Sequence, residues 1–218
     1  MRSTREDTNL WLAQAIFDLG GVSFGDYTIG RTTVHSPVYV NPRVLISRPH
    51  VLRQVAKLLQ QEVLIGLSRR KPRCSRFDVV AGVPYGGLLL ATVFSLLIDL
   101  PLLYTLKPST AAAHGERAIE GRYSSGQTVL IVDDLINTGG SIVETAARLE
   151  DVGLVVKDAV VLIDREQGAG ARLAEAGYNL IPILRLKTML TYYYSQRLIS
   201  GEWFEKSLAY LDTNQPHG

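Results

Sequence analysis

Residues 129–141 place a buried strand, two adjacent carboxylates and a glycine-containing turn in one unbroken run. The first part, residues 129–132, is apolar and mostly β-branched, which predicts a strand buried on both faces of a parallel sheet. Asp133 and Asp134 follow at the carboxyl end of this strand, where open α/β sheets bind their ligands. Because a core strand has no structural use for two successive charges, the pair predicts a binding site.

The turn after the carboxylates has the composition of a phosphate-binding loop. Its small residues and hydroxyls occur in the order Asn137, Thr138, Gly139, Gly140 and Ser141. The apolar periodicity of residues 142–149 predicts a helix directly afterwards, whose positive N-terminal end attracts a phosphate dianion. A plain strand-to-helix connection would account for this turn, but not for the carboxylates in front of it. We therefore interpret the run as a sugar phosphate site, in which Asp133 and Asp134 accept hydrogen bonds from ribose hydroxyls.

Apolar strands alternate with helical patterns through most of the chain. Strands are predicted at residues 77–82, 100–106, 128–133, 159–164 and 179–184, and helices at residues 48–67 and 86–98. Such alternation implies right-handed crossovers and a mainly parallel sheet of the α/β class. An amphipathic helix at residues 10–19 and two alternating strands at residues 24–29 and 36–40 predict a small N-terminal unit outside this sheet.

A chain of 218 residues with 46% hydrophobic content is enough for one large domain with a full core. We divide residues 1–218 into an N-terminal unit of about residues 1–47, a core of about residues 48–190 and a C-terminal helical part at residues 187–211. The net charge is only +2, which leaves no broad electrostatic footprint for nucleic acid. An anionic ligand would therefore have to be bound by local groups.

The single cysteine, Cys74, excludes an internal disulfide and fits a reducing compartment. We interpret it as a free, non-catalytic thiol. The charged first residues lack the apolar core of a secretory signal, and the longest apolar stretch, at residues 88–103, is too short to span a bilayer. We therefore expect a cytoplasmic protein without a membrane partner.

The run at residues 129–141 closely resembles the phosphoribosyl pyrophosphate (PRPP) motif of type I phosphoribosyltransferases. Further segments narrow the resemblance to orotate phosphoribosyltransferases, particularly the version fused in UMP synthases, and occur in matching order at residues 24–27, 36–40, 82–92 and 164–168. The resemblance implies the type I phosphoribosyltransferase fold, a mainly parallel twisted sheet flanked by helices, with a small N-terminal hood. It also implies a homodimer that converts orotate and PRPP to orotidine 5′-monophosphate and pyrophosphate in pyrimidine biosynthesis. Mg²⁺ would be bound mainly through PRPP, without dedicated protein ligands.

Two further site residues follow from the resemblance. Tyr85 lies in a glycine-rich turn, residues 82–87, where the backbone and the following helix would approach the pyrophosphate. Arg165 inherits the role of binding orotate, because a guanidinium fork matches a carboxylate or the edge of a pyrimidinedione. The alternative for Arg165 is a salt bridge to a neighbouring acid such as Glu166.

Two segments depart from the family pattern. The family has a mobile loop that is rich in Arg and Lys and closes over the active site of a neighbouring subunit. The corresponding segment of this chain keeps Lys107 and His114, which are catalytic candidates together with Asp133 and Asp134. Ala112 stands where a further lysine is expected, and Arg31 replaces a lysine on the pyrimidine side. We therefore expect slow turnover of orotate. Two alternatives stay open: a degenerate relative that binds PRPP or a nucleotide as a regulator, and a phosphoribosyltransferase for another base.

Overall fold

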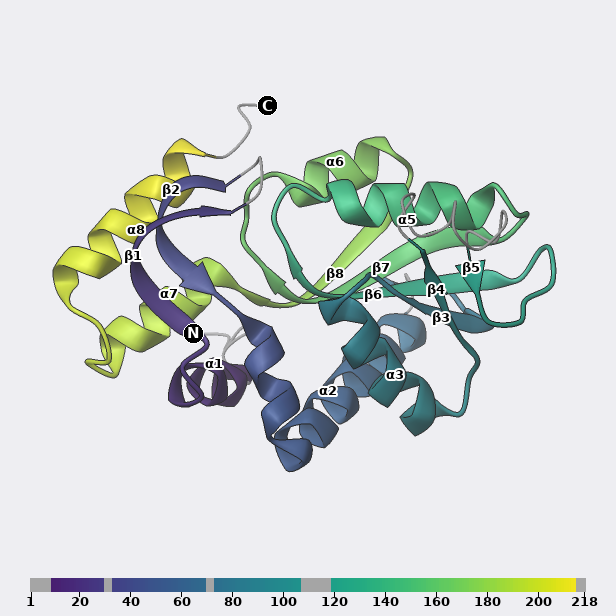
Figure 1. Ribbon diagram of the computed structural model, residues 1–218, viewed down its shortest axis with the longest axis horizontal. Helices are drawn as coiled ribbons and strands as arrows, with labels where there is room; N and C mark the ends of the chain where they lie inside the picture. Colours follow the sequence, from purple (N-terminus) through teal and green to yellow (C-terminus); the bar gives the residue numbers. More distant parts are fainter. Residues whose placement is uncertain (1–8, 30–32, 70–72, 107–118, 215–218) are drawn as a thin grey trace.

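The computed structural model describes residues 9–29, 33–69, 73–106 and 119–214. The predictions for Arg31, Lys107 and His114 concern residues outside these ranges. Within them, an open sheet carries helices on both faces, and a smaller unit of strands and helices lies at one end of it (Figure 1). Among the described helices, none combines the length and the apolar character needed to cross a membrane.

The main sheet has six strands in the order β5-β4-β3-β6-β7-β8. They are β3 (Val79–Gly82), β4 (Leu102–Thr105), β5 (Ile119–Glu120), β6 (Thr128–Ile136), β7 (Val155–Asp164) and β8 (Asn179–Arg185). All neighbouring strands are parallel except β4 and β5, which confirms the predicted mainly parallel sheet. The sequence did not predict β5, because a strand of two residues has no periodicity to detect.

The strand order places the ends of the central strands side by side. The chain passes from β3 to β4 on one side and then returns to β6 on the other, so the order reverses between β3 and β6. Gly82 at the end of β3 is in register with Val132 of β6, and Ile136 at the end of β6 with Asp164 of β7. This reversal at the carboxyl ends is where α/β sheets form their ligand crevice.

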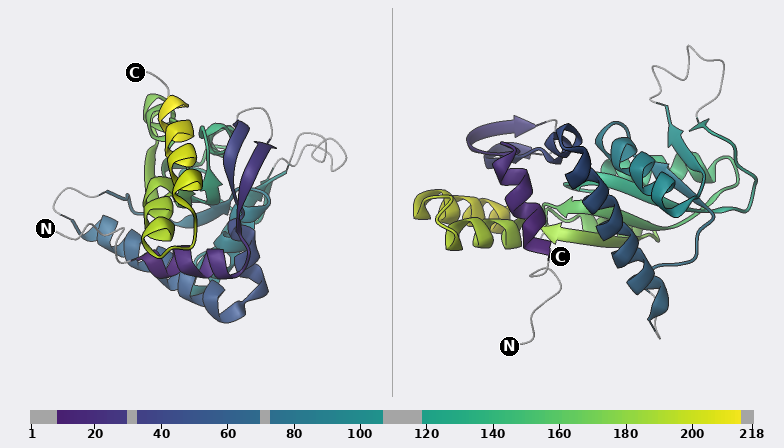
Figure 2. Two further views of the ribbon diagram at one scale, coloured as in Figure 1. Left: turned by 90° about the vertical axis from the view of Figure 1, so that its left-hand side faces the viewer. Right: turned by 90° about the horizontal axis from the view of Figure 1, so that it is seen from below.

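The buried strands explain how both faces of the sheet are covered. Along β6, Leu130 and Val132 belong to the core beneath α2 (Pro49–Ser68) and α3 (Gly86–Ile98). The alternate residues, Val129 and Ile131, belong to the core beneath α5 (Gly140–Glu150). Two-sided burial requires the continuous apolar run seen in the sequence. Figures 1 and 2 show α5 and α6 (Ala169–Glu175) on the face opposite α2 and α3.

The hood contains α1 (Leu10–Asp18) and an antiparallel pair, β1 (Val22–Ile29) and β2 (Thr33–Val40). The predicted pair outside the main sheet is therefore confirmed. A 3₁₀ helix, η2 (Pro42–Ser47), links β2 to α2.

The C-terminal part, predicted as helical over residues 187–211, forms two helices, α7 (Leu186–Ser195) and α8 (Gly201–Thr213). The Ser200 side chain caps α8 by accepting a hydrogen bond from the Trp203 N–H. Both helices lie beside the N-terminal hood (Figures 1 and 2), and the buried Tyr193 hydroxyl donates to the Ala13 carbonyl at 2.8 Å. The hood is thus built from both ends of the chain.

Candidate active site

The structure brings the described site residues together around two adjoining cavities at the carboxyl ends of the central strands. The first has a volume of about 350 Å³, and the predicted residues that line it are Tyr85, Asp133, Asp134, Asn137, Ser141 and Arg165. The second has a volume of about 330 Å³, and the predicted residues that line it are Asp133, Asn137, Thr138, Gly139, Gly140 and Ser141. The shared residues make the two cavities parts of one site.

The two carboxylates at the end of β6 lie in a largely desolvated position. Asp133 is only 6% exposed, and its Oδ1 accepts a hydrogen bond from the Asp134 N–H at 2.8 Å. Burial, together with the nearby Asp134 charge, raises the pKa of Asp133 well above its usual range. Burial also raises the pKa of Asp134, although hydrogen bonding to Asp133 and the charge of Arg43 oppose this shift. Hydroxyl donors from a ligand would stabilise these poorly solvated charges.

The turn between β3 and α3 presses its backbone against the carboxylate pair. A Cβ atom on Gly87 would lie 2.5 Å from the Val132 carbonyl oxygen and 2.8 Å from the Cα of Asp133, and one on Gly86 would fall on the Asp134 carboxylate. Only glycine fits at such approaches. The N-terminal end of α3 therefore lies beside the carboxylates. The Leu88 N–H in this first turn donates to the Val83 carbonyl at 2.9 Å, and the positive end of the helix dipole faces the site.

The predicted phosphate-binding turn forms the start of α5. Gly139, with φ +82°, occupies the N-cap in the left-handed region, which explains the need for glycine at this position. The Asn137 Nδ2 donates to Thr33 Oγ1 at 3.2 Å and so connects the turn to the hood, while its buried Oδ1 has no hydrogen-bond partner among the described residues. The turn thus combines a helix N-terminus with an unsatisfied polar atom.

Arg165 is buried and lines the first cavity. It is 1% exposed, and its Nη2 donates to Ser36 Oγ at 2.9 Å and to the Val38 carbonyl at 3.4 Å. Its Nε has no hydrogen-bond partner among the described residues, and burial lowers the pKa of this side chain. Glu166, the alternative partner, instead accepts a hydrogen bond from the Lys187 N–H through Oε2. The arrangement supports an anionic ligand group as the counter-charge of Arg165.

Two arginines that the sequence did not indicate also line the site. Arg43 of η2 lines the first cavity, and Arg172 of α6 lines the second. The Arg172 Nη1 lies 3.5 Å from the position that a Cβ on Gly140 would occupy. No motif or periodicity distinguishes either residue, because each reaches the site only through the packing of its short helix.

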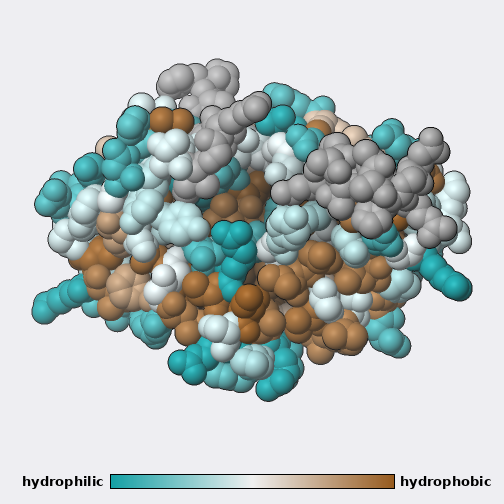
Figure 3. Space-filling view, in the orientation of Figure 1, coloured by the Kyte–Doolittle hydropathy of each residue, from teal (hydrophilic) through white to brown (hydrophobic). Residues whose placement is uncertain are grey.

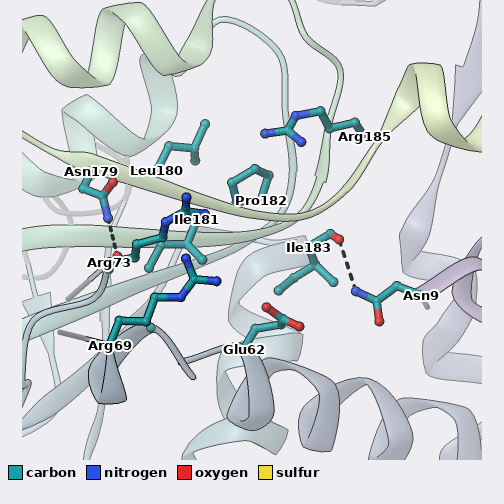
Figure 4. A pocket seen from close by; sticks show the side chains of 11 residues that line it. Asn9, Glu62, Arg69, Arg73, Asn179, Leu180, Ile181, Pro182, Ile183 and Arg185 are labelled. Atoms are coloured by element: carbon teal, nitrogen blue, oxygen red, sulfur yellow. Dashed lines mark hydrogen bonds between the residues drawn. The ribbon is translucent and has the colours of Figure 1, made fainter. Parts of the chain in front are cut away.

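Another cavity, of about 330 Å³, lies at the outer edge of β8 (Figure 4) and is lined by none of the predicted site residues. Figure 4 shows Glu62 of α2 and Arg69, the residue that follows α2, directed toward this edge strand. Asn179 Nδ2 donates to the Arg73 carbonyl at 2.7 Å, and Asn9 Nδ2 donates to the Ile183 carbonyl at 3.4 Å. This cavity lacks the carboxylate pair and both glycine turns, which meet instead at the carboxyl ends of β3 and β6.

Comparisons with known proteins identify the family of this chain. The model of the phosphoribosyl transferase domain family matches residues 46–177. UMP synthase of Bos taurus is 36% identical over 203 residues, which cover 93% of this chain and 40% of that protein. Orotate phosphoribosyltransferase of Caenorhabditis elegans is 35% identical over 177 residues, which cover 81% of this chain and 74% of that protein.

Solved structures of the same family have the same fold as this chain. UMP synthase of Leishmania donovani superposes with a TM-score of 0.81 at 33% identity, over 94% of this chain and 42% of that one. Orotate phosphoribosyltransferase of Aeropyrum pernix superposes with a TM-score of 0.68 at 31% identity, over 83% of this chain and 97% of that one. This chain therefore spans less than half of the bovine and Leishmania UMP synthases, and most of the single-function relatives. The fold and the motifs together show that the chain belongs to the phosphoribosyltransferase family, among the orotate phosphoribosyltransferases.

Proposed function

We propose that this chain transfers the 5-phosphoribosyl group of PRPP to orotate, forming orotidine 5′-monophosphate and pyrophosphate for UMP biosynthesis. One observation carries the proposal: the carboxylate pair, the phosphate-binding turn and the buried arginine converge on two adjoining cavities. Relatives named orotate phosphoribosyltransferase support the choice of orotate as the base.

Each part of the substrates has a matching position. The turn at residues 137–141 would bind the 5′-phosphate, and the Asp133 and Asp134 carboxylates would accept hydrogen bonds from the ribose hydroxyls. The backbone beside Gly86 and Gly87 would approach the pyrophosphate, and Arg165 would pair with the orotate anion. The two reactants would then meet at C1 of the ribose, between the carboxylates and Arg165.

The reaction breaks the bond between C1 and a pyrophosphate oxygen as a ring nitrogen of orotate bonds to C1. Positive charge grows on the ribose ring and negative charge on the leaving group, and no side chain has to act as a nucleophile. The protein contributes by holding two anions together, by stabilising the leaving charge and by excluding water.

Magnesium fits this donor set, because Mg²⁺ binds substrate phosphates and waters together with one or two carboxylates. We propose that PRPP supplies most of its ligands and that Asp133 and Asp134 lie within reach of the remaining coordination positions. When bound, the ion would neutralise part of the pyrophosphate charge.

We also propose that the chain is a homodimer, as the resemblance implies. The α3 helix carries an exposed apolar stripe that includes Leu89, Leu96 and Leu97, with Leu96 78% exposed. Figure 3 shows apolar side chains gathered over α3. Sedimentation should give about twice the chain mass of 24.0 kDa, and Leu96→Glu should reduce it to the monomer while Leu96→Met does not. A strict monomer at micromolar concentration would contradict this proposal.

The decisive experiment incubates the native protein with PRPP, Mg²⁺ and orotate and follows the orotate absorbance. A panel with uracil and purines in the same assay tests the alternative of another base. PRPP binding by calorimetry without turnover of any base would instead favour a regulatory relative.

The sequence of residues 107–117, which has Ala112 where the family pattern has a lysine, leads us to propose that turnover is slow. Ala112→Lys should then increase turnover more than it increases PRPP affinity, because the added charge would act on the leaving group. An absence of any gain would show that another cation already fills this role.

A further inference from the structure

PRPP, the ligand of the proposed function, carries phosphate groups at both ends. Of the described residues that line the first cavity, Arg43 and Arg165 carry positive charge, and Arg165 is fixed at 1% exposure by Ser36 and Val38 of the hood. In the second cavity, Arg172 is the cation among the described lining residues. The site thus has one exposed arginine on each of its two cavities.

Arg43 lies where the pyrophosphate is expected. It shares the first cavity with Tyr85 and Gly86 at the start of α3, and its charge acts on the Asp134 carboxylate. Its Nε donates to Asn41 Oδ1 at 3.0 Å, while its Nη groups have no hydrogen-bond partner among the described residues. A guanidinium in this position offers two donors to a phosphate at the N-terminus of α3.

Arg172 lies where the 5′-phosphate is expected. Its Nη1 and Nη2 are 3.5 and 3.8 Å from the Cβ position built on Gly140, the first residue of α5. Glu144 of α5 also lines this cavity and carries a negative charge. A phosphate dianion carries more charge than one carboxylate, and the N-terminus of α5 would bind it together with Arg172.

We propose that Arg43 and Arg172 divide the two phosphate ends of the ligand, with Arg43 binding the pyrophosphate and Arg172 binding the 5′-phosphate. This inference rests on the proposed function. It supplies cations in a chain whose sequence has Ala112 where the family pattern has a lysine.

Two ligands separate the roles, because orotidine 5′-monophosphate keeps the 5′-phosphate of PRPP and lacks the pyrophosphate. Calorimetry should measure the Kd of both ligands for the native protein and for Arg43→Gln and Arg172→Gln. Arg43→Gln should raise the Kd of PRPP about 10- to 100-fold and change that of the nucleotide less than about 2-fold. Arg172→Gln should raise both values about 10- to 100-fold.

The controls distinguish a charge contact from a structural effect. Arg76→Gln removes an exposed arginine that lines none of these cavities and should change neither Kd. Because Arg43 and Arg172 are also exposed, the Gln variants should keep the native circular dichroism, and the Lys variants should recover part of the lost affinity. Equal losses in the Lys and Gln variants would overturn a charge role.

Three other outcomes would contradict parts of the proposal. If the native protein binds neither ligand, the proposed function itself fails. If the native protein binds both and Arg43→Gln weakens both equally, Arg43 acts on the ribose end and its assignment to the pyrophosphate is wrong. If either Gln variant behaves like Arg76→Gln, that arginine does not contact the ligand.

Discussion

Replacing both carboxylates of β6, as Asp133→Asn with Asp134→Asn, should weaken PRPP binding and at the same time stabilise the ligand-free protein. Both effects have one cause. Asp133 is buried and Asp134 is half-buried beside it, and both lie against the backbone of α3. Their charges are therefore unfavourable without a ligand, and hydrogen-bond donors of a ligand would stabilise them. Asn has nearly the same shape, and its Oδ1 on residue 133 can still accept the N–H of residue 134.

The expected magnitudes follow from the contacts. Two charge-assisted hydrogen bonds are each worth about 1.5–3 kcal/mol, and neutral amides retain part of them, so we expect a loss of about 2–4 kcal/mol in PRPP affinity. This corresponds to a Kd roughly 30- to 700-fold higher. Removing the buried charges should add about 1–2 kcal/mol to the free energy of unfolding at neutral pH. For a chain of this length, that gain raises the Tm by about 2–8 °C.

The stability difference should depend on pH with a defined sign. Burial raises the folded-state pKa of each carboxyl above its ordinary value of 3.8, so the folded state binds protons more tightly than the unfolded state. Below the unfolded pKa both states are protonated and the native protein has its full stability, which it loses as the pH rises through the folded pKa. The Tm advantage of the double variant should therefore be largest near pH 7.5 and shrink as the pH falls toward 4.

Calorimetric titration with PRPP and Mg²⁺ measures the affinity, and thermal unfolding followed by circular dichroism without Mg²⁺ measures the stability between pH 4 and 7.5. Leu64→Asn on α2, at an exposed position away from the site, controls for a general effect of substitution. An unchanged Kd would remove the ribose-binding assignment. A lower Tm at pH 7.5 would refute the reasoning about buried charge.

Three further predictions concern single side chains. Gly87→Ala should lower the free energy of unfolding by about 1–3 kcal/mol, because the added Cβ would clash with the Val132 carbonyl and with Asp133. Urea unfolding measures this loss, and a variant as stable as the native protein would contradict the clash. Arg165→Lys should raise the KM for orotate at least about 10-fold and the KM for PRPP much less, because an ammonium cannot form the two parallel hydrogen bonds of a guanidinium. Equal increases in both KM values would contradict the orotate role. Burial raises the pKa of the Cys74 thiol to about 12. A disulfide reagent at pH 8 should therefore label this thiol only when the protein unfolds. Rapid labelling of the folded protein would show that the thiol is reactive.

Much of the fold follows from the sequence, because local periodicity records which faces of an element are buried. The apolar run before Asp133 specifies a strand covered on both sides, and the glycines at residues 86–87 and 139–140 mark places where the backbone approaches another group. The motif residues within the described ranges were predicted for the same reason. Each motif residue is recognised by its residue type and by its position after a predicted strand, and both can be seen in the neighbouring sequence.

The tertiary structure decided which distant segments meet. The side chain of Arg165 is oriented by Ser36 and Val38 of the hood, and the hood itself is completed by α7 and α8 from the other end of the chain. Arg43 and Arg172 gave no signal in the sequence, because each is an ordinary exposed arginine on a short helix. Their positions beside the two helix N-termini depend on strand order, register and packing between elements, none of which is encoded in the local pattern around either residue.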